Sequence, residues 1–108
     1  MPSETALAAG LSELMVLRLL KEQEMYGYEI VQAIAVRTRH ALTPGEGVIY
    51  PLLHALEKDG LLRSRRKSVG GRSRIYYSLT ARGAKRLSAM TDHWTALTGA
   101  VGAVLHAV

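Results

Sequence analysis

The chain has 108 residues, no cysteine and a formal net charge of +5 at pH 7. This length is typical of one domain with a small core, so we expect stability to be shared with a second copy, and the absence of cysteine excludes a disulfide framework and a thiolate metal site. The amino terminus lacks the pattern of a signal peptide, and the uncharged residues 93–108 are too few and too polar to span a bilayer, so we expect a cytoplasmic protein without a membrane segment.

Charge is distributed unevenly along the chain. Residues 1–59 contain five basic and eight acidic side chains, whereas residues 60–108 contain nine basic side chains and one acidic side chain. All nine basic residues lie between Gly60 and Thr91, where there is no carboxylate. A basic segment of this kind directly after a helix is typical of a surface that binds nucleic acid.

The first half of the sequence predicts three helices. Apolar residues recur at spacings of three and four in residues 11–22 and again from residue 28 to about residue 39, which indicates two amphipathic helices. The segment Thr43-Pro44-Gly45-Glu46 has the pattern of a capping box, so a third helix is expected to begin there and to end at Gly60. Its predicted buried stripe comprises Val48, Ile49, Leu52, Leu53 and Leu56.

Pro51 lies inside this third predicted helix. Its ring would crowd the carbonyl group of Gly47, and it has no N–H to donate. We therefore expect either a kink at Pro51 or a helix whose regular part begins later.

The basic segment predicts a β-hairpin. Residues 61–68 and 74–79 are expected to pair as antiparallel strands around Gly70-Gly71. Alternation along the second strand divides its side chains between two faces: Ile75, Tyr77 and Leu79 are expected inward, and Arg74, Tyr76 and Ser78 outward.

Thr80 is expected to cap a final helix. Apolar residues alternate along this helix at spacings of three and four, the pattern of a coiled-coil seam, and we expect the seam to be the interface of a homodimer. The predicted interface residues are Leu87, Met90, Trp94, Leu97, Val101, Val104 and Val108. Trp94 has two interpretations: it anchors the packing of the interface, or it forms one wall of an aromatic slot in which a planar ligand stacks.

The predicted elements follow the order of a winged helix-turn-helix domain: two helices, a capped third helix, a hairpin and a final helix. The predicted fold class is mainly α with a small β-hairpin: a winged helix-turn-helix followed by a long C-terminal dimerisation helix. We expect residues 1–79 to form the DNA-binding part and residues 80–108 the dimerisation helix, within one structural domain. In such a domain the third helix enters the major groove and the hairpin, or wing, grips the flanking backbone.

The candidate DNA contacts come from the third helix and the wing. Tyr50 and His54 lie one helical turn apart and share a face, from which they contact either DNA or packing neighbours. The basic side chains of the wing are expected to neutralise phosphates, with one Arg entering the minor groove; the alternative is a solvated basic hairpin. The predicted DNA-binding residues are Gly47, Tyr50, Pro51, His54, Arg63, Arg65, Arg66, Lys67, Arg72 and Arg74.

Four segments together resemble the PadR-like transcriptional regulators: residues 26–30 (YGYEI), 47–53 (GVIYPLL), 56–62 (LEKDGLL) and 71–80 (GRSRIYYSLT). With a single helix after the wing, the chain looks like the short subfamily. The resemblance implies a homodimer, usually a repressor, that binds a palindromic operator in double-stranded DNA, needs no cofactor and is released by a small molecule.

The resemblance also implies a ligand site. Some short members of the family bind flat aromatic or cationic compounds between the two subunits, against tryptophans of the terminal helix. Trp94 occupies the matching place, and the implied ligand-binding residues are Leu11, Leu14, Met90, Trp94 and Leu97.

Two other functions fit the same sequence. A sequence-indifferent architectural protein would use the wing only to grip the DNA backbone, and a protein-interaction adaptor with the same fold would bind no DNA. Catalysis finds little support because the four histidines lie in different segments and the carboxylates are scattered, so we expect neither an enzyme nor a metal site.

Overall fold

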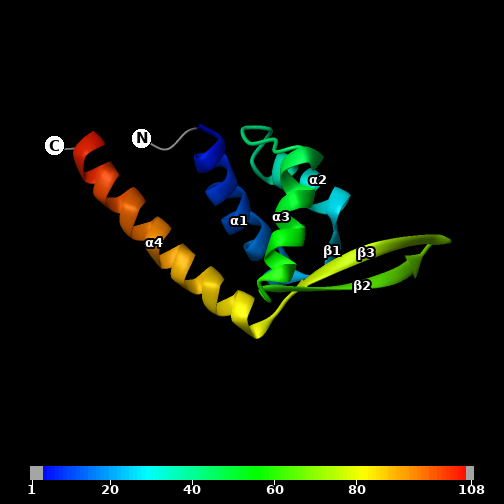
Figure 1. Cartoon of the computed structure of the whole chain (residues 1–108). Helices are drawn as coiled ribbons and strands as arrows, with labels where there is room; N and C mark the ends of the chain where they lie inside the picture. Colours follow the sequence, from blue (N-terminus) through cyan, green and yellow to red (C-terminus); the bar gives the residue numbers. More distant parts are fainter. Residues whose placement is uncertain (1–3, 107–108) are drawn as a thin grey trace.

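The structure is a computed structural model that describes the backbone of residues 4–106 and the side chains of residues 10–106. Four helices and a three-stranded sheet follow one another along the chain (Figure 1). Their bounds are α1 Glu4–Glu22, β1 Met25–Tyr26, α2 Gly27–Arg37, α3 Glu46–Lys58, β2 Leu62–Val69, β3 Arg72–Leu79 and α4 Ala81–Leu105. The expected class, mainly helical with a small antiparallel sheet and a long last helix, is confirmed.

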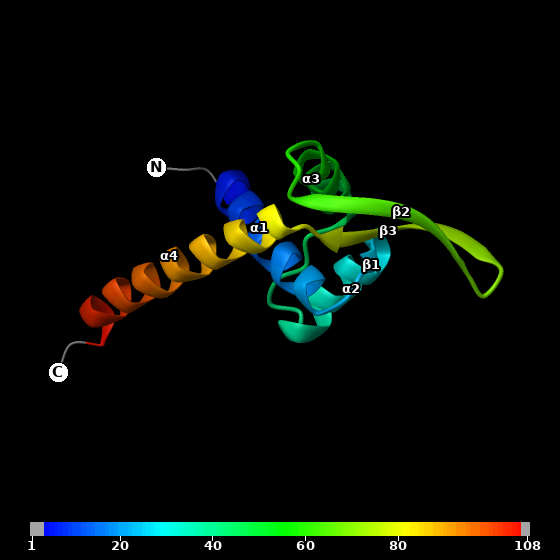
Figure 2. The same cartoon turned by 90° about the horizontal axis from the view of Figure 1, so that it is seen from below.

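Helices α1, α2 and α3 form the body of the molecule, and α4 and the β2–β3 hairpin project from it in opposite directions (Figures 1 and 2). The hairpin is called the wing below. Apolar side chains of the three helices, the base of the wing and the first turns of α4 make one core: Val16, Leu17, Leu19, Leu20, Met25, Ile30, Ile34, Ile49, Leu53, Leu56, Leu61, Leu62, Tyr77 and Leu87. The molecule measures 57 × 29 × 25 Å along its principal axes, and it is elongated because α4 and the wing project from the body.

Both amphipathic helices of the first half are confirmed, with different bounds. The first begins at Glu4 rather than at Leu11. The second ends at Arg37, because Arg39 and His40 have φ angles of 52° and 62°. Side chains crowd the backbone in this left-handed region, so the right-handed helix cannot continue through it.

The start of α3 differs from the prediction. Gly45, in an extended conformation, precedes the first helical residue and no side chain caps the helix, so the capping box expected at Thr43 is wrong. The later start places Pro51 near the N-terminus of a helix that runs through it, where the missing N–H removes one of the first hydrogen bonds. Of the predicted buried stripe, Ile49, Leu53 and Leu56 are buried, Leu52 is half-buried and Val48 is exposed.

The sheet has the strand order β1-β3-β2, and both pairings are antiparallel. In the wing, Leu62 stands opposite Leu79 and Val69 opposite Arg72. Gly70 and Gly71, with φ angles of 60° and 78°, form the two-residue turn, which requires positive φ at both positions. The two-residue strand β1 was not predicted, because it is too short to carry an alternating pattern.

The predicted faces of the second wing strand are wrong at Tyr76 and Ile75. Tyr76 was expected outward but is 8% exposed, whereas Ile75, expected inward, is 37% exposed. Tyr26 of β1 stands opposite Tyr76, and the two rings meet edge to face with centroids 5.4 Å apart. The ammonium group of Lys67 lies 4.9 Å from the centre of the Tyr76 ring. The unpredicted strand thus covers the face that was expected to meet solvent.

The junction between the wing and α4 is tightly packed. As predicted, Thr80 caps α4: its hydroxyl accepts a hydrogen bond from the Gly83 N–H at 3.0 Å and donates to the Leu61 carbonyl, also at 3.0 Å. Gly83 is buried, and a Cβ at this position would overlap the Leu61 carbonyl oxygen. Only glycine therefore allows α4 to approach the backbone at the base of the wing.

Replacing Gly83 with Ala is expected to destabilise the protein by about 1–3 kcal/mol, the usual cost of overpacking a tight site, even though Ala is the better helix former. Urea denaturation measures this difference in the free energy of unfolding. The matched control is Gly99→Ala in the same helix, where nothing lies within 4 Å of the added Cβ. Equal stability of Gly83→Ala and the unmodified protein would contradict the tight junction.

Candidate nucleic-acid interface

The four predicted contact residues of α3 are exposed: Gly47, Tyr50, Pro51 and His54. A Cβ added at Gly47 would meet nothing within 4 Å, so this part of the helix surface is open. Tyr50 combines two environments. Its ring lies against the backbone of Gly27, where a Cβ would overlap the ring, yet 36% of the residue remains exposed. Tyr50 is therefore both a packing residue and part of the outer face of α3.

The register of the wing divides its six cations between two faces. Arg63, Arg65, Lys67, Arg72 and Arg74 share the face that carries Tyr76. Only Arg66 lies on the face of Tyr77 and Ile75, which is the face directed toward α3. The guanidinium group of Arg66 donates to the hydroxyl of Ser73, a neutral partner, so its charge is not offset there.

Glu24, in the segment between α1 and β1, binds two of these cations. Its carboxylate accepts hydrogen bonds from Arg65 at 2.7 and 3.1 Å and from Lys67 at 2.8 Å. The hydrogen bonds from Arg65 and then from Lys67 lower the pKa of Glu24 to about 2. No pattern in the sequence indicates this contact, because Glu24 lies 41 residues before Arg65 in the acidic half of the chain.

The other wing cations keep their charge available. Arg74 stacks on the ring of Tyr26, with 4.4 Å from its guanidinium carbon to the ring centre, which orients the side chain without neutralising it. Arg63 and Arg72 are exposed, and within residues 10–106 neither forms an ion pair. Arg63, Arg66, Arg72 and Arg74 are thus the cations best placed to meet phosphates.

A cavity of about 370 Å³ lies between α3 and the wing. We call it the tyrosine cavity; its lining residues are Tyr26, Gly27, Tyr28, Tyr50, His54, Arg74, Ile75 and Tyr77. Burial, more than the nearby Glu46, raises the pKa of Tyr50, and burial, more than the nearby Glu57, raises the pKa of Tyr77. Both side chains therefore remain protonated hydrogen-bond donors at neutral pH. The sequence analysis did not place Tyr28 or Tyr77 at a candidate site. Both lie in tyrosine-rich segments of the sequence, which are the one signal that could have indicated them.

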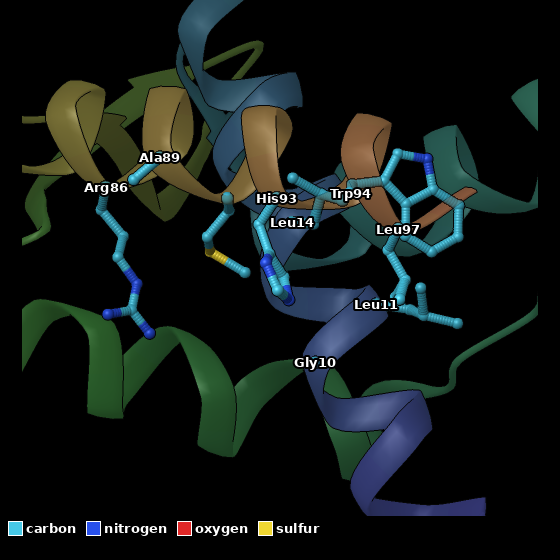
Figure 3. A pocket seen from close by; sticks show the side chains of 9 residues that line it. Gly10, Leu11, Leu14, Arg86, Ala89, His93, Trp94 and Leu97 are labelled. Carbon is cyan, nitrogen blue, oxygen red and sulfur yellow. The ribbon is translucent and has the colours of Figure 1, made fainter. Parts of the chain in front are cut away.

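A second cavity, of about 460 Å³, lies between α1 and α4 (Figure 3). All five residues that the family resemblance implied for ligand binding line it: Leu11, Leu14, Met90, Trp94 and Leu97. Its polar lining comes from Arg86 and His93, and Arg86 is also paired with Glu13 at 3.2 Å. We call it the α1–α4 cavity.

The predicted interface residues of α4 fall into two groups. Leu87 is 4% exposed and belongs to the core of its own chain, so it is not available to a partner. Met90 is half-buried, and beyond it Trp94, Leu97, Val101 and Val104 are exposed along the projecting helix. Val108 lies outside the described residues.

Two kinds of site find no support in residues 10–106. No group of three or more His, Asp or Glu side chains is placed to hold a metal ion there. Among the helices described, none has the length and apolar character needed to cross a membrane.

Comparison with known proteins places this geometry in a family. The family model described as the transcriptional regulator PadR-like family matches residues 16–89. The chain is 36% identical to transcriptional regulator Rv3488 of Mycobacterium tuberculosis over 75 residues, which make up 69% of this chain and 67% of that protein. It is 37% identical to transcriptional regulator YqjI of Escherichia coli over 78 residues, which make up 72% of this chain but only 36% of that protein.

A solved structure agrees with these sequence matches. The PadR-like transcriptional regulator BC4206 of Bacillus cereus superposes with a TM-score of 0.81 at 30% identity, over 92% of this chain and 95% of that one. The matched segment includes α2, α3 and the wing, the elements that build the candidate interface. The chain therefore belongs to the PadR-like family of transcriptional regulators and has its winged-helix fold.

Proposed function

We propose that the protein is a homodimeric repressor that binds a palindromic operator through α3 and the wing and is released by a small planar aromatic ligand. The observation that carries this proposal is the position of three features on one short chain. A cationic wing stands beside the outer face of α3, an apolar stretch of α4 is exposed on the opposite side, and an apolar cavity adjoins that stretch.

The charge of the wing supports DNA as the partner. Four of its cations have no carboxylate partner among residues 10–106, and the tip formed by Gly70 and Gly71 projects far from the body (Figure 2). Contacts from such a hairpin go mainly to phosphates and fix the register of the protein on the duplex. Tyr50 and His54 then face the bases, where they offer hydroxyl and imidazole groups for direct readout.

The exposed apolar stretch of α4 supports a homodimer. Trp94, Leu97, Val101 and Val104 lie along one stripe that the described side chains of the same chain leave exposed. An isolated helix containing Gly99 and Gly102 is weak in water. A second copy packed along this stripe covers it by twofold symmetry. The same symmetry presents two DNA-binding surfaces, which must lie about 34–36 Å apart to read successive major grooves.

The α1–α4 cavity supports ligand control. Trp94 is 44% exposed, and a planar ring stacked on it would lie at the proposed dimer contact. Any change in the packing of α4 against its partner alters the distance between the two α3 helices. A ligand that binds the altered arrangement more tightly than the DNA-bound arrangement lowers the affinity of the protein for the operator. DNA lowers the affinity for the ligand by the same factor, because the coupling free energy is reciprocal.

A sequence-indifferent architectural protein remains the second candidate. The observation in its favour is that the outer face of α3 offers Gly47, Tyr50, Pro51 and His54, but no Arg, Asn or Gln, the residues that discriminate bases best. Comparing affinity for the operator with affinity for random duplex at one salt concentration separates the two.

Selection of bound fragments from genomic DNA is the principal test. A palindromic duplex is expected to emerge and to bind the protein more tightly than random duplex, and the protein is expected to sediment as a dimer at micromolar concentration. If the dimer neutralises about six to ten phosphates, its affinity falls by about 10³ to 10⁵ between 50 and 200 mM salt. A monomer, or a dissociation constant that does not respond to salt, would contradict the proposal.

Replacing Glu24 with Gln is expected to tighten DNA binding. The variant frees Arg65 and Lys67 from their carboxylate, and each subunit gains one positive charge on the wing. The slope of log affinity against log salt should steepen by about 0.9 per subunit. The control is Glu22→Gln, which removes a carboxylate that pairs with Arg37 at 2.6 Å, away from the wing. Equal affinities for the two variants would exclude a specific effect of Glu24 on the wing.

Ligand binding is expected to quench the fluorescence of Trp94, the one tryptophan in the sequence. A planar aromatic compound stacked in the α1–α4 cavity should lower the emission and release DNA over the same range of concentration. A panel of aromatic cations and phenolic compounds tests this by titration of the protein–DNA complex. Absence of quenching across the panel would instead favour Trp94 as an anchor of interface packing.

A further inference from the structure

The hydroxyl group of Tyr77, in β3, has no hydrogen-bond partner among the side chains and backbone that the structure describes. The residue is 5% exposed, and its hydroxyl forms no hydrogen bond with any residue in the range 10–106. Within that range, however, no side-chain nitrogen or oxygen is both unpartnered and sealed from solvent. The hydroxyl must therefore reach open space, and the open space beside Tyr77 is the tyrosine cavity.

The tyrosine cavity is suited to an anion. No carboxylate lines it, although the negative charge of Glu57, which accepts a hydrogen bond from the hydroxyl of Ser64, acts on Tyr77 from outside the cavity. Arg74 lines one side, held in place by its stacking on the Tyr26 ring. The first residues of α2 line another side; the aligned peptide dipoles of a helix favour negative charge there, and the Glu29 carboxylate of the first turn already accepts a hydrogen bond from the Tyr26 N–H.

The position of the cavity identifies the anion. One wall belongs to the outer face of α3, through Tyr50 and His54, and another belongs to the wing, through Arg74 and Ile75. A duplex that contacts both elements must pass over the mouth of the cavity, so the anionic group nearest to it is a phosphate of the DNA backbone.

We propose that the tyrosine cavity holds one backbone phosphate in each half-site, with the Tyr77 hydroxyl donating a hydrogen bond to it beside the Arg74 guanidinium group. This inference rests on the proposed binding of DNA by α3 and the wing. Tyr77 is rigid because its ring is enclosed by the core, so the contact fixes the depth and register of α3 in the groove rather than attracting DNA from a distance.

The test replaces Tyr77 with Phe and measures binding to the palindromic duplex obtained by selection. Because the hydroxyl has no partner in the described part of the chain, the melting temperature should not change. Affinity should fall about tenfold for each half-site, and therefore about a hundredfold for the dimer, as expected for loss of one hydrogen bond to a charged group in each subunit. The salt dependence should stay the same, because a neutral donor displaces no counterion. The matched control is Tyr76→Phe, whose ring lies on the opposite face of the wing.

A second arm locates the phosphate. Single methylphosphonate groups, which remove the charge of one phosphate, are introduced in turn along the duplex. At one position in each half-site, the substitution should weaken binding by the unmodified protein but cause much less further loss for Tyr77→Phe. Such non-additivity at one position is the expected signature of a direct contact.

The outcomes separate this inference from the function on which it rests. An affinity of Tyr77→Phe equal to that of the unmodified protein, or equal losses for Tyr77→Phe and Tyr76→Phe, overturns the phosphate site while leaving DNA binding intact. Losses that add at every methylphosphonate position also overturn it. If the unmodified protein binds no duplex at any salt concentration, the proposed function fails and the phosphate site fails with it.

Discussion

The backbone carbonyl of Leu61 joins the elements on which regulation depends. The Leu61 N–H donates to Leu56 at the end of α3, and its carbonyl accepts from the Thr80 N–H at 3.1 Å and from the Thr80 hydroxyl at 3.0 Å. Gly83 of α4 rests against the same carbonyl. The end of α3, the base of the wing and the start of α4 thus contact one another through one residue. In the proposed dimer, these contacts would couple a displacement of α4 to α3 and the wing.

The contacts at Leu61 connect the two regions of the molecule that contain the cavities. The α1–α4 cavity lies along the projecting helix, and the tyrosine cavity lies between α3 and the wing, so the two are on different sides of the molecule. Under the proposed function, a ligand at the first cavity would act on DNA contacts near the second by changing how the two subunits are oriented, with no change required within the winged helix.

Electrostatic balance sets how strongly the wing attracts DNA. Glu24 offsets part of the charge of Arg65 and Lys67, while Arg63 lies near the base of the wing, Arg66 lies between the two paired cations, and Arg72 lies next to the turn at the tip. The positive charge that Glu24 does not offset is therefore spread along the length of the wing. Because Glu24 has a pKa of about 2, its carboxylate stays ionised throughout the physiological range, and the balance is a constant property of the fold rather than a response to pH.

The sequence by itself determined the order of helices, the wing, the cap at Thr80 and the family, because periodic burial, paired glycines and local capping are properties of neighbouring residues. It did not determine the start of α3, where the extended backbone at Gly45 prevailed over a local capping pattern. Only the tertiary structure decided that Glu24 meets Arg65, that strand β1 covers Tyr76, and that Leu87 belongs to the core while Trp94 does not. Each of these depends on contacts between segments distant along the chain, which leave no periodic signal in either segment.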